Sequence, residues 1–333
     1  MQTLLKRIKK AGIIVLFISI HYVLVVSGIS AYWEWTPKSG KWENPKYHIG
    51  ETSAEQWEIA MNTYKAEDYK EALSEFKKLL EYFPTSKEAP EAQFMVGECY
   101  EKLDSPYEAC QSYQEVIDKY PSTSRLKEIV ERQKKIADYF YAYKTSDMSI
   151  KEKAKGIFAV SNWEKAANIY QMAIKNYPYY EKADEVQYRI ADCYMKMGKY
   201  ETARTEFEKV SSKYLDSPWI DDAEYQKGMC WLNESRKFPN SDQIFEKAIK
   251  SFEEFIARYS ESEFIDKAKD EVKKLNESKS ERIYEIAKFY EKDGDLNAAK
   301  IYYRQVIEQF PDSIWAGASK SRLNTILKNE NQS

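Results

Sequence analysis

The sequence predicts an all-helical chain built from about six helix pairs and a closing helix. Two regularities carry this prediction. Alanine is followed four residues later by an aromatic residue at Ala72/Phe76, Ala109/Tyr113, Ala166/Tyr170, Ala203/Phe207, Ala248/Phe252 and Ala299/Tyr303. Proline stands twelve residues after four of these alanines, at Pro84, Pro121, Pro178 and Pro311. No strand-like alternation interrupts the series, so helices are expected throughout.

The first helix of each pair is marked by a small residue. It stands twelve positions before the alanine at Ala60, Gly97, Ala191 and Ala287, whereas Ala137 and Gly228 stand 29 and 20 positions before theirs. Small residues let two helices approach closely, aromatic residues fill the gap to the next pair, and proline cannot continue a helix. This spacing is typical of the tetratricopeptide repeat, a helix-turn-helix unit of about 34 residues.

Hydroxyl residues stand before the next helix at five of the six junctions. They are Ser86, Thr123, Ser217, Ser262 and Ser313. Each is expected to accept a hydrogen bond from a free N–H at a helix start, and Pro218 to occupy a first helical position. The stretch 314–327 is expected to be a closing helix that covers the last apolar face.

The first 31 residues resemble a targeting segment. Basic residues from Lys6 to Lys10 precede an apolar run over 11–26, and small residues follow. This layout predicts either a cleaved signal peptide or an N-terminal membrane anchor. We expect an exported, non-lipidated protein of the periplasm or outer membrane, or one held in the inner membrane through residues 11–31.

The remaining chain divides by composition into four parts. Residues 32–51 are expected to form an extended arm, because Pro37, Gly40 and Pro45 oppose a helix. Its tryptophans either pack back on the first repeats or dock on a partner. The later parts are a repeat pair over 52–122, an array with its closing helix over 123–328, and a tail over 329–333.

Composition excludes several function classes. The chain has 333 residues, a net charge of −3 and 15% aromatic residues, which argues against a disordered chain and against general nucleic-acid binding. His48 is the only histidine beyond the apolar run, so the usual general base is missing and no metal site is expected. We expect no enzyme activity, no cofactor and no small-molecule substrate.

Three of the four cysteines hold one repeat position. Cys99, Cys193 and Cys230 each stand two residues after the small residue of a first helix. Three cysteines at one position indicate small packing residues. A disulfide between Cys99 and Cys110, within one helix pair, is the alternative.

The fifth position of each first helix predicts a binding groove. It is occupied by Trp57, Phe94, Tyr188, Tyr225 and Tyr284, with Lys134 as the exception. Neighbouring positions on the same face carry Met61, Tyr64, Glu98, Asp192, Met195, Lys196, Met229 and Lys288. Aromatic and methionine side chains on a groove suit a bound protein segment. The alternative is that the fifth position packs between helix pairs.

The chain from about residue 150 to 327 resembles the BamD family of the bacterial barrel-assembly machinery. The likeness is carried by 162–166, 177–179, the Gly228 pair with its insertion over 236–243, 284–290 and 311–313. It implies an envelope protein that holds a barrel-assembly component and unfolded barrel segments. No cysteine precedes Cys99, so the lipid-attachment cysteine of that family has no counterpart. The alternative is a general envelope adaptor, for example in cell-wall synthesis.

Overall fold

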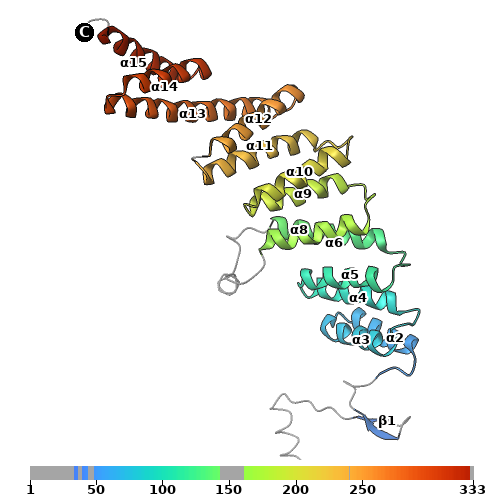
Figure 1. Cartoon of the computed structure of the whole chain (residues 1–333). Helices are drawn as coiled ribbons and strands as arrows, with labels where there is room; N and C mark the ends of the chain where they lie inside the picture. Colours follow the sequence, from blue (N-terminus) through green and yellow to red (C-terminus); the bar gives the residue numbers. More distant parts are fainter. Residues whose placement is uncertain (1–33, 37–39, 44–48, 143–160, 240, 331–333) are drawn as a thin grey trace, which may run out of the picture. The chain divides into compact units, whose positions relative to one another are not determined.

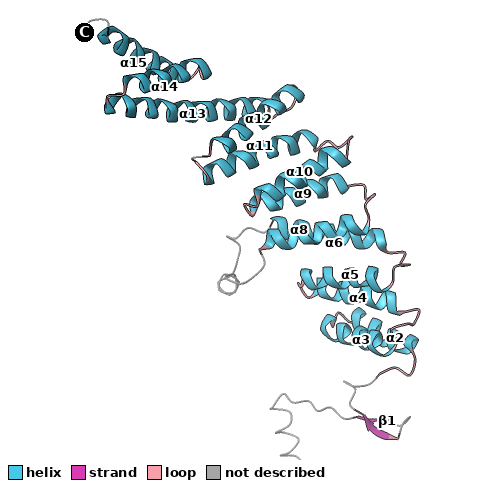
Figure 2. Ribbon diagram, in the orientation of Figure 1, coloured by secondary structure: helices cyan, strands magenta, loops and turns pink. Residues whose placement is uncertain are grey.

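The computed structural model describes residues 34–36, 40–43, 49–142, 161–239 and 241–330, and these are mainly helical (Figures 1 and 2). The predicted all-α fold class is confirmed. In chain order the helices of the described ranges are α2 (Ser53–Lys65), α3 (Tyr69–Tyr82), α4 (Ala89–Lys102), α5 (Pro106–Lys119), α6 (Leu126–Ala142), α8 (Asn162–Asn176), α9 (Ala183–Lys196), α10 (Tyr200–Lys213), α11 (Ile220–Lys237), α12 (Asp242–Arg258), α13 (Ile265–Asp293), α14 (Leu296–Gln309) and α15 (Ile314–Glu330).

The helices fall into two compact units, one ending at Leu103 and one beginning at Asp104. In the first unit α2 packs on α3 and α3 on α4. In the second unit each helix from α5 to α15 packs on the next. Because sequence neighbours are also neighbours in space, each unit is a stack of successive helices.

The core of each pair follows the small-residue register that the sequence predicts. The alanines of that register are fully buried, at Ala60, Ala72, Ala109, Ala137, Ala166, Ala191, Ala203, Ala248, Ala287 and Ala299. The aromatic residues four positions after the second-helix alanines are also fully buried. Gly228 shows why small residues are needed, since a Cβ there would lie 2.6 Å from Cε1 of Phe252.

Four of the five junction hydroxyls accept a backbone N–H at the start of the next helix, as expected. Thr123 accepts from Arg125 at 3.2 Å, Ser217 from Trp219 at 3.1 Å and Ser262 from Phe264 at 3.3 Å. Ser313 Oγ accepts a hydrogen bond from the N–H of Ala316 at 3.1 Å, inside α15. The predicted cap at Ser86 is wrong, because its buried hydroxyl has no hydrogen-bond partner in the described part of the chain. The prediction that Pro218 occupies a first helical position is wrong as well, because α11 begins at Ile220 with Trp219 as its N-cap.

The two other serines tie the junction turn to the preceding first helix. Ser217 donates to Asp184 at 2.7 Å, and Ser262 donates to Asp221 at 2.7 Å. Both carboxylates lie in the first turn of a first helix, α9 or α11. These bonds fix the position of the turns at one edge of the second unit.

The N-terminal arm contains a small hairpin that the sequence analysis did not anticipate. Strands β1 (Glu34–Thr36) and β2 (Lys41–Glu43) pair antiparallel and place Trp35 opposite Trp42. The two rings meet edge to face at 6.1 Å and are 51% and 63% exposed. Packing of the arm on the repeats and docking on a partner both stay predictions.

The last repeats include a first helix that is much longer than the others. Helix α13 spans 29 residues, and it packs on α12, α14 and α15. Leu275 joins the core around α12, whereas Ala287 joins the core with Ala299 and Tyr303. The predicted closing helix is α15, whose Leu323 and Ile326 cover that last core.

All four cysteines are free and buried. The alternative of a disulfide between Cys99 and Cys110 is thus wrong, and the interpretation as packing residues agrees with their burial. Burial raises the pKa of each of the four thiols to about 12.

The predicted targeting segment, residues 1–31, lies outside the described residues. In the part that is described, no helix combines the length and apolarity needed to cross a bilayer.

Candidate protein-binding surfaces

The aromatic residues of the fifth position are packed rather than displayed. Phe94, Tyr188 and Tyr225 are buried, and Trp57 and Tyr284 are half-buried. The expectation of an exposed aromatic strip is therefore wrong for Phe94, Tyr188 and Tyr225. The reason is local packing. Trp57 contacts Phe76 and Tyr188 contacts Phe207, in each case the aromatic residue of the second helix in the same pair. Tyr225 and Tyr284 make the equivalent contacts with Phe252 and Tyr303.

We call the fifth-position aromatic residues the aromatic ladder. In the second unit, a second set of aromatic residues covers the ladder residues. Tyr188 lies 4.9 Å from Trp219, Tyr225 stacks on Phe264 at 4.7 Å, and Tyr284 lies 5.0 Å from Trp315, between ring centroids. The covering residue stands at the start of the next first helix for Trp219 and Phe264, and at the start of the closing helix α15 for Trp315. The ladder is thus the contact that joins one repeat to the next.

Trp219, Phe264 and Trp315 were missed by the sequence analysis, although a signal was present. Each stands two residues after a junction serine, at Ser217, Ser262 and Ser313. Trp219 stands 31 residues after Tyr188, and Trp315 stands 31 residues after Tyr284. The separation between Tyr225 and Phe264 is longer by the insertion in the Gly228 repeat. A periodicity search for aromatic pairs at that separation would have found them.

The side chains of the predicted groove that remain accessible on the first helices are mainly polar or methionine. In the second unit Asp192 is buried, Met195 and Met229 are half-buried, and Lys288 is exposed. In the first unit Met61, Tyr64 and Glu98 are half-buried. The Tyr64 hydroxyl donates to Glu98 at 3.5 Å, and burial followed by the Glu98 charge raises the pKa of Tyr64 to about 12.

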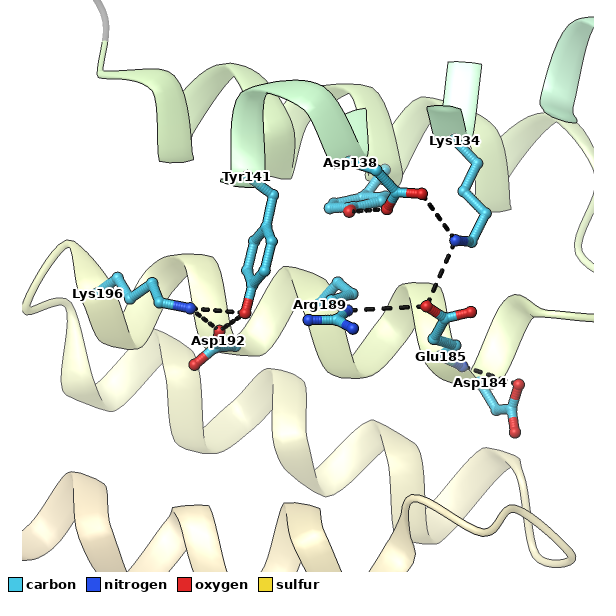
Figure 3. A network of polar contacts seen from close by, with 9 residues as sticks. Lys134, Asp138, Tyr141, Asp184, Glu185, Arg189, Asp192 and Lys196 are labelled. Atoms are coloured by element: carbon cyan, nitrogen blue, oxygen red, sulfur yellow. Dashed lines mark hydrogen bonds and ion pairs between the residues drawn. The ribbon is translucent and has the colours of Figure 1, made fainter. Parts of the chain in front are cut away.

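A network of charged residues joins α6 to α9 in the second unit (Figure 3). The Lys134 ammonium donates to Asp138 at 2.9 Å on its own helix and to Glu185 at 3.4 Å on α9. Glu185 is also 3.7 Å from Nε of Arg189. Lys134, the exception in the aromatic ladder, therefore joins two first helices by charge where other repeats use aromatic packing.

The second part of the network centres on Asp192. Its carboxylate accepts hydrogen bonds from the Tyr141 hydroxyl and the Lys196 ammonium, and Lys196 donates to Tyr141 at 2.6 Å (Figure 3). The Arg189 guanidinium lies 4.8 Å from the centre of the Tyr141 ring. Burial, followed by the hydrogen bond to Asp192, raises the pKa of the Tyr141 hydroxyl.

The Tyr141–Asp192 pair has a counterpart in the first unit, Tyr64–Glu98. Tyr141 and Asp192 are 51 residues apart in the sequence, whereas Tyr64 and Glu98 are 34 residues apart. The difference equals the length of the extra chain between Ala137 and Ala166. Both pairs connect successive first helices at the same repeat positions. They therefore belong to the architecture, and their charges are largely satisfied within the chain.

The accessible side chains named above on the first helices are charged, polar or methionine. In the described ranges no group of three or more His, Cys, Asp or Glu residues is arranged to hold a metal ion. The first helices of the second unit present fixed ion pairs with methionine and lysine between them. Such a surface offers hydrogen bonds and apolar contact to another protein.

Helix pairs of this register, stacked with a closing helix, define a tetratricopeptide-repeat protein, a class built to bind other proteins. The family model of the tetratricopeptide repeat matches residues 91–123. A second family model, YfiO, described as an outer membrane lipoprotein, matches residues 143–331. Because this match spans more than half of the chain, the chain belongs to that outer membrane lipoprotein family.

Two named relatives show the extent of the likeness. The chain is 23% identical over 197 residues to the outer membrane protein assembly factor BamD of Neisseria gonorrhoeae, covering 55% of this chain and 74% of that protein. It is 21% identical over 148 residues to BamD of Caulobacter vibrioides, covering 44% and 48%. A solved structure of MamA protein is 19% identical with a TM-score of 0.32, covering 64% of this chain and 98% of that chain.

Proposed function

We propose that this chain is a non-enzymatic scaffold of the cell envelope that holds protein partners during the assembly of outer-membrane β-barrel proteins. The observation that carries the proposal is the family match over residues 143–331, which spans α8 to α15. The relatives over this region are named outer membrane protein assembly factors. The partners would be barrel-assembly components or unfolded barrel segments.

The binding face of the second unit would be formed by the accessible residues of its first helices, Met195, Met229 and Lys288. The first unit would present a face of its own with Met61 and Tyr64. Their neighbours are held by aromatic pairs and the ion-pair network, so the face is preorganised and loses little entropy on binding. The buried ladder residues would shape this face without contacting a partner.

Location in the envelope is part of the proposal. The basic start and the apolar run before residue 27 would export the chain, and the array would work in the periplasm or at the outer membrane. Anchoring in the inner membrane through residues 11–31 is the alternative. Cell fractionation with intact-mass measurement separates a cleaved chain from an anchored one.

The test is partner identification from the native envelope. Tagged full-length chain is purified after detergent solubilisation, and bound proteins are identified by mass. Enrichment of a barrel-assembly component supports the proposal. Enrichment of cell-wall synthesis enzymes in its place would overturn it in favour of a general envelope adaptor, and so would the absence of any envelope partner.

A matched pair of charge reversals tests the binding face. Lys288 is exposed and pairs with Glu285 at 2.9 Å on α13, and Lys250 pairs with Glu254 at 3.7 Å on α12, the second helix of its pair. Exposed pairs contribute little to stability, so both variants should fold. Lys288→Glu should reduce partner recovery, whereas Lys250→Glu should not.

A further inference from the structure

A groove at the edge of the second unit is formed by two neighbouring junction turns. It lies between the turn from α8 to α9 and the turn from α10 to α11, and has a volume of about 620 Å³. Two apolar residues of its lining are largely exposed: Tyr179 is 90% and Leu215 is 76% exposed. We call this feature the turn-edge groove.

The apolar residues of the turn-edge groove depart from the pattern of the other junctions. The residue aligned with Tyr179 is Thr85, Ser122, Asp216, Glu261 or Asp312 elsewhere. Leu215 occupies a position that is proline in four junctions and serine in the fifth. The turn itself does not require Tyr179 or Leu215, so their exposed apolar area indicates a contact with another molecule.

The rim of the groove is acidic. Glu181, Asp184 and Asp216 line it together with one basic residue, Lys213. Among the described residues neither Glu181 nor Asp216 forms an ion pair. The pKa of Tyr180 is raised by burial and then by carboxylates that include Glu131 and Glu181. A positively charged partner would neutralise this field.

The walls of the groove are fixed before anything binds. The Ser217 hydroxyl donates to Asp184 at 2.7 Å, which joins the second turn to the start of α9. Within the turns, the N–H of Tyr180 donates to the Tyr177 carbonyl at 3.1 Å, and that of Ser217 donates to the Tyr214 carbonyl at 3.0 Å. A preformed groove costs little ordering entropy when a partner docks.

We propose that the turn-edge groove docks a protein segment that presents an aromatic or aliphatic side chain flanked by lysine or arginine. The apolar side chain packs between Tyr179 and Leu215, and the flanking cations face Glu181 and Asp216. This surface is separate from the first-helix face, and the inference goes beyond the proposed function because it requires no role in barrel assembly.

The probe is a fluorescein-labelled peptide, Gly-Lys-Phe-Lys-Phe-Lys-Gly, titrated with the full chain and followed by fluorescence anisotropy. Two matched peptides replace either both phenylalanines by serine or all lysines by glutamate. The proposal requires binding of the first peptide, with affinity for each matched peptide lower by about tenfold or more.

Three variants locate the binding. Tyr179→Ser with Leu215→Ser should weaken the first peptide about tenfold or more, because both apolar contacts are lost. Glu181→Gln with Asp216→Asn should weaken it several-fold and flatten its salt dependence. Ile301→Ser removes an exposed apolar residue from α14, away from the groove, and should leave affinity unchanged.

Several results would overturn the proposal. They are absence of binding by the first peptide, equal binding by the glutamate peptide, and wild-type affinity in both groove variants with unchanged circular dichroism. Sedimentation velocity provides a further check. A concentration-dependent dimer that Tyr179→Ser with Leu215→Ser abolishes would show that a second copy of the chain occupies the groove. A failure of the barrel-assembly proposal alone would leave the peptide binding intact.

Discussion

The backbone of Gly228 is in direct contact with the ring of Phe252. A Cβ atom at Gly228 would lie 2.6 to 3.0 Å from three ring carbons of Phe252, a separation that packed atoms do not adopt. Gly228 is the small residue of α11 and Phe252 is the aromatic residue of α12, so the contact sets the distance between the two helices of that pair.

Replacing Gly228 by alanine should therefore destabilise the second unit. Alanine improves helix propensity by about 1 kcal/mol, but overpacking against Phe252 costs about 1 to 3 kcal/mol. We expect a lower melting temperature by circular dichroism. The control is Gly317→Ala in α15, where a Cβ meets no atom within 4 Å and only the gain in propensity should appear. Equal stabilisation by both substitutions would contradict the contact.

Ala203 tests the same register in another pair. It is fully buried in a core with Tyr188, Ala191 and Phe207. Ala203→Leu should lower the melting temperature, because a larger side chain separates α9 from α10 at a cost of about 1 to 3 kcal/mol. The neighbouring Thr202 is exposed, and Thr202→Leu should change the melting temperature little. An unchanged melting temperature for Ala203→Leu would show that the register is wrong.

The aromatic contact between Tyr188 and Trp219 should be measurable as a coupling energy. Their ring centroids lie 4.9 Å apart across the junction between repeats. In a double-mutant cycle with Tyr188→Leu and Trp219→Leu, we expect a coupling of about 0.5 to 1.5 kcal/mol from urea unfolding. The pair Tyr188→Leu with Trp315→Leu, in separate cores, serves as control and should be additive.

Alkaline pH should destabilise the fold. Burial raises the pKa of Cys110 from 9.0 to about 12, and the pKa values of Cys99, Cys193 and Cys230 are raised to about the same value. Because the folded pKa exceeds the unfolded one, the associated stability is complete below about pH 9 and is lost as pH rises towards 12. Melting temperatures measured across this range should fall.

The thiols themselves report on this burial. At pH 8 a disulfide reagent such as dithionitrobenzoate should label none of the four cysteines in the folded chain and all four in guanidinium. Cys110→Ala should reduce the loss of stability between pH 9 and 12. Rapid labelling of native protein would contradict the buried positions.

The repeat register could be read from the sequence alone. Alanine and aromatic residues recur at fixed separations, and only close helix packing requires small residues at both Ala191 and Ala203. The separations therefore identified the helix pairs, the closing helix, the insertion in the Gly228 repeat and the interpretation of Cys193 as a packing residue. These features depend on contacts within one repeat, where sequence distance determines which side chains meet.

Exposure of the fifth-position residues could not be read in the same way. Tyr188 and Tyr225 hold positions that face a groove when a repeat is considered singly, but Trp219 and Phe264 of the next repeat cover them. The sequence determined which residues are equivalent between repeats. The tertiary structure decided which of them reach the surface, because burial depends on the neighbouring repeat and on turns such as the one that exposes Tyr179.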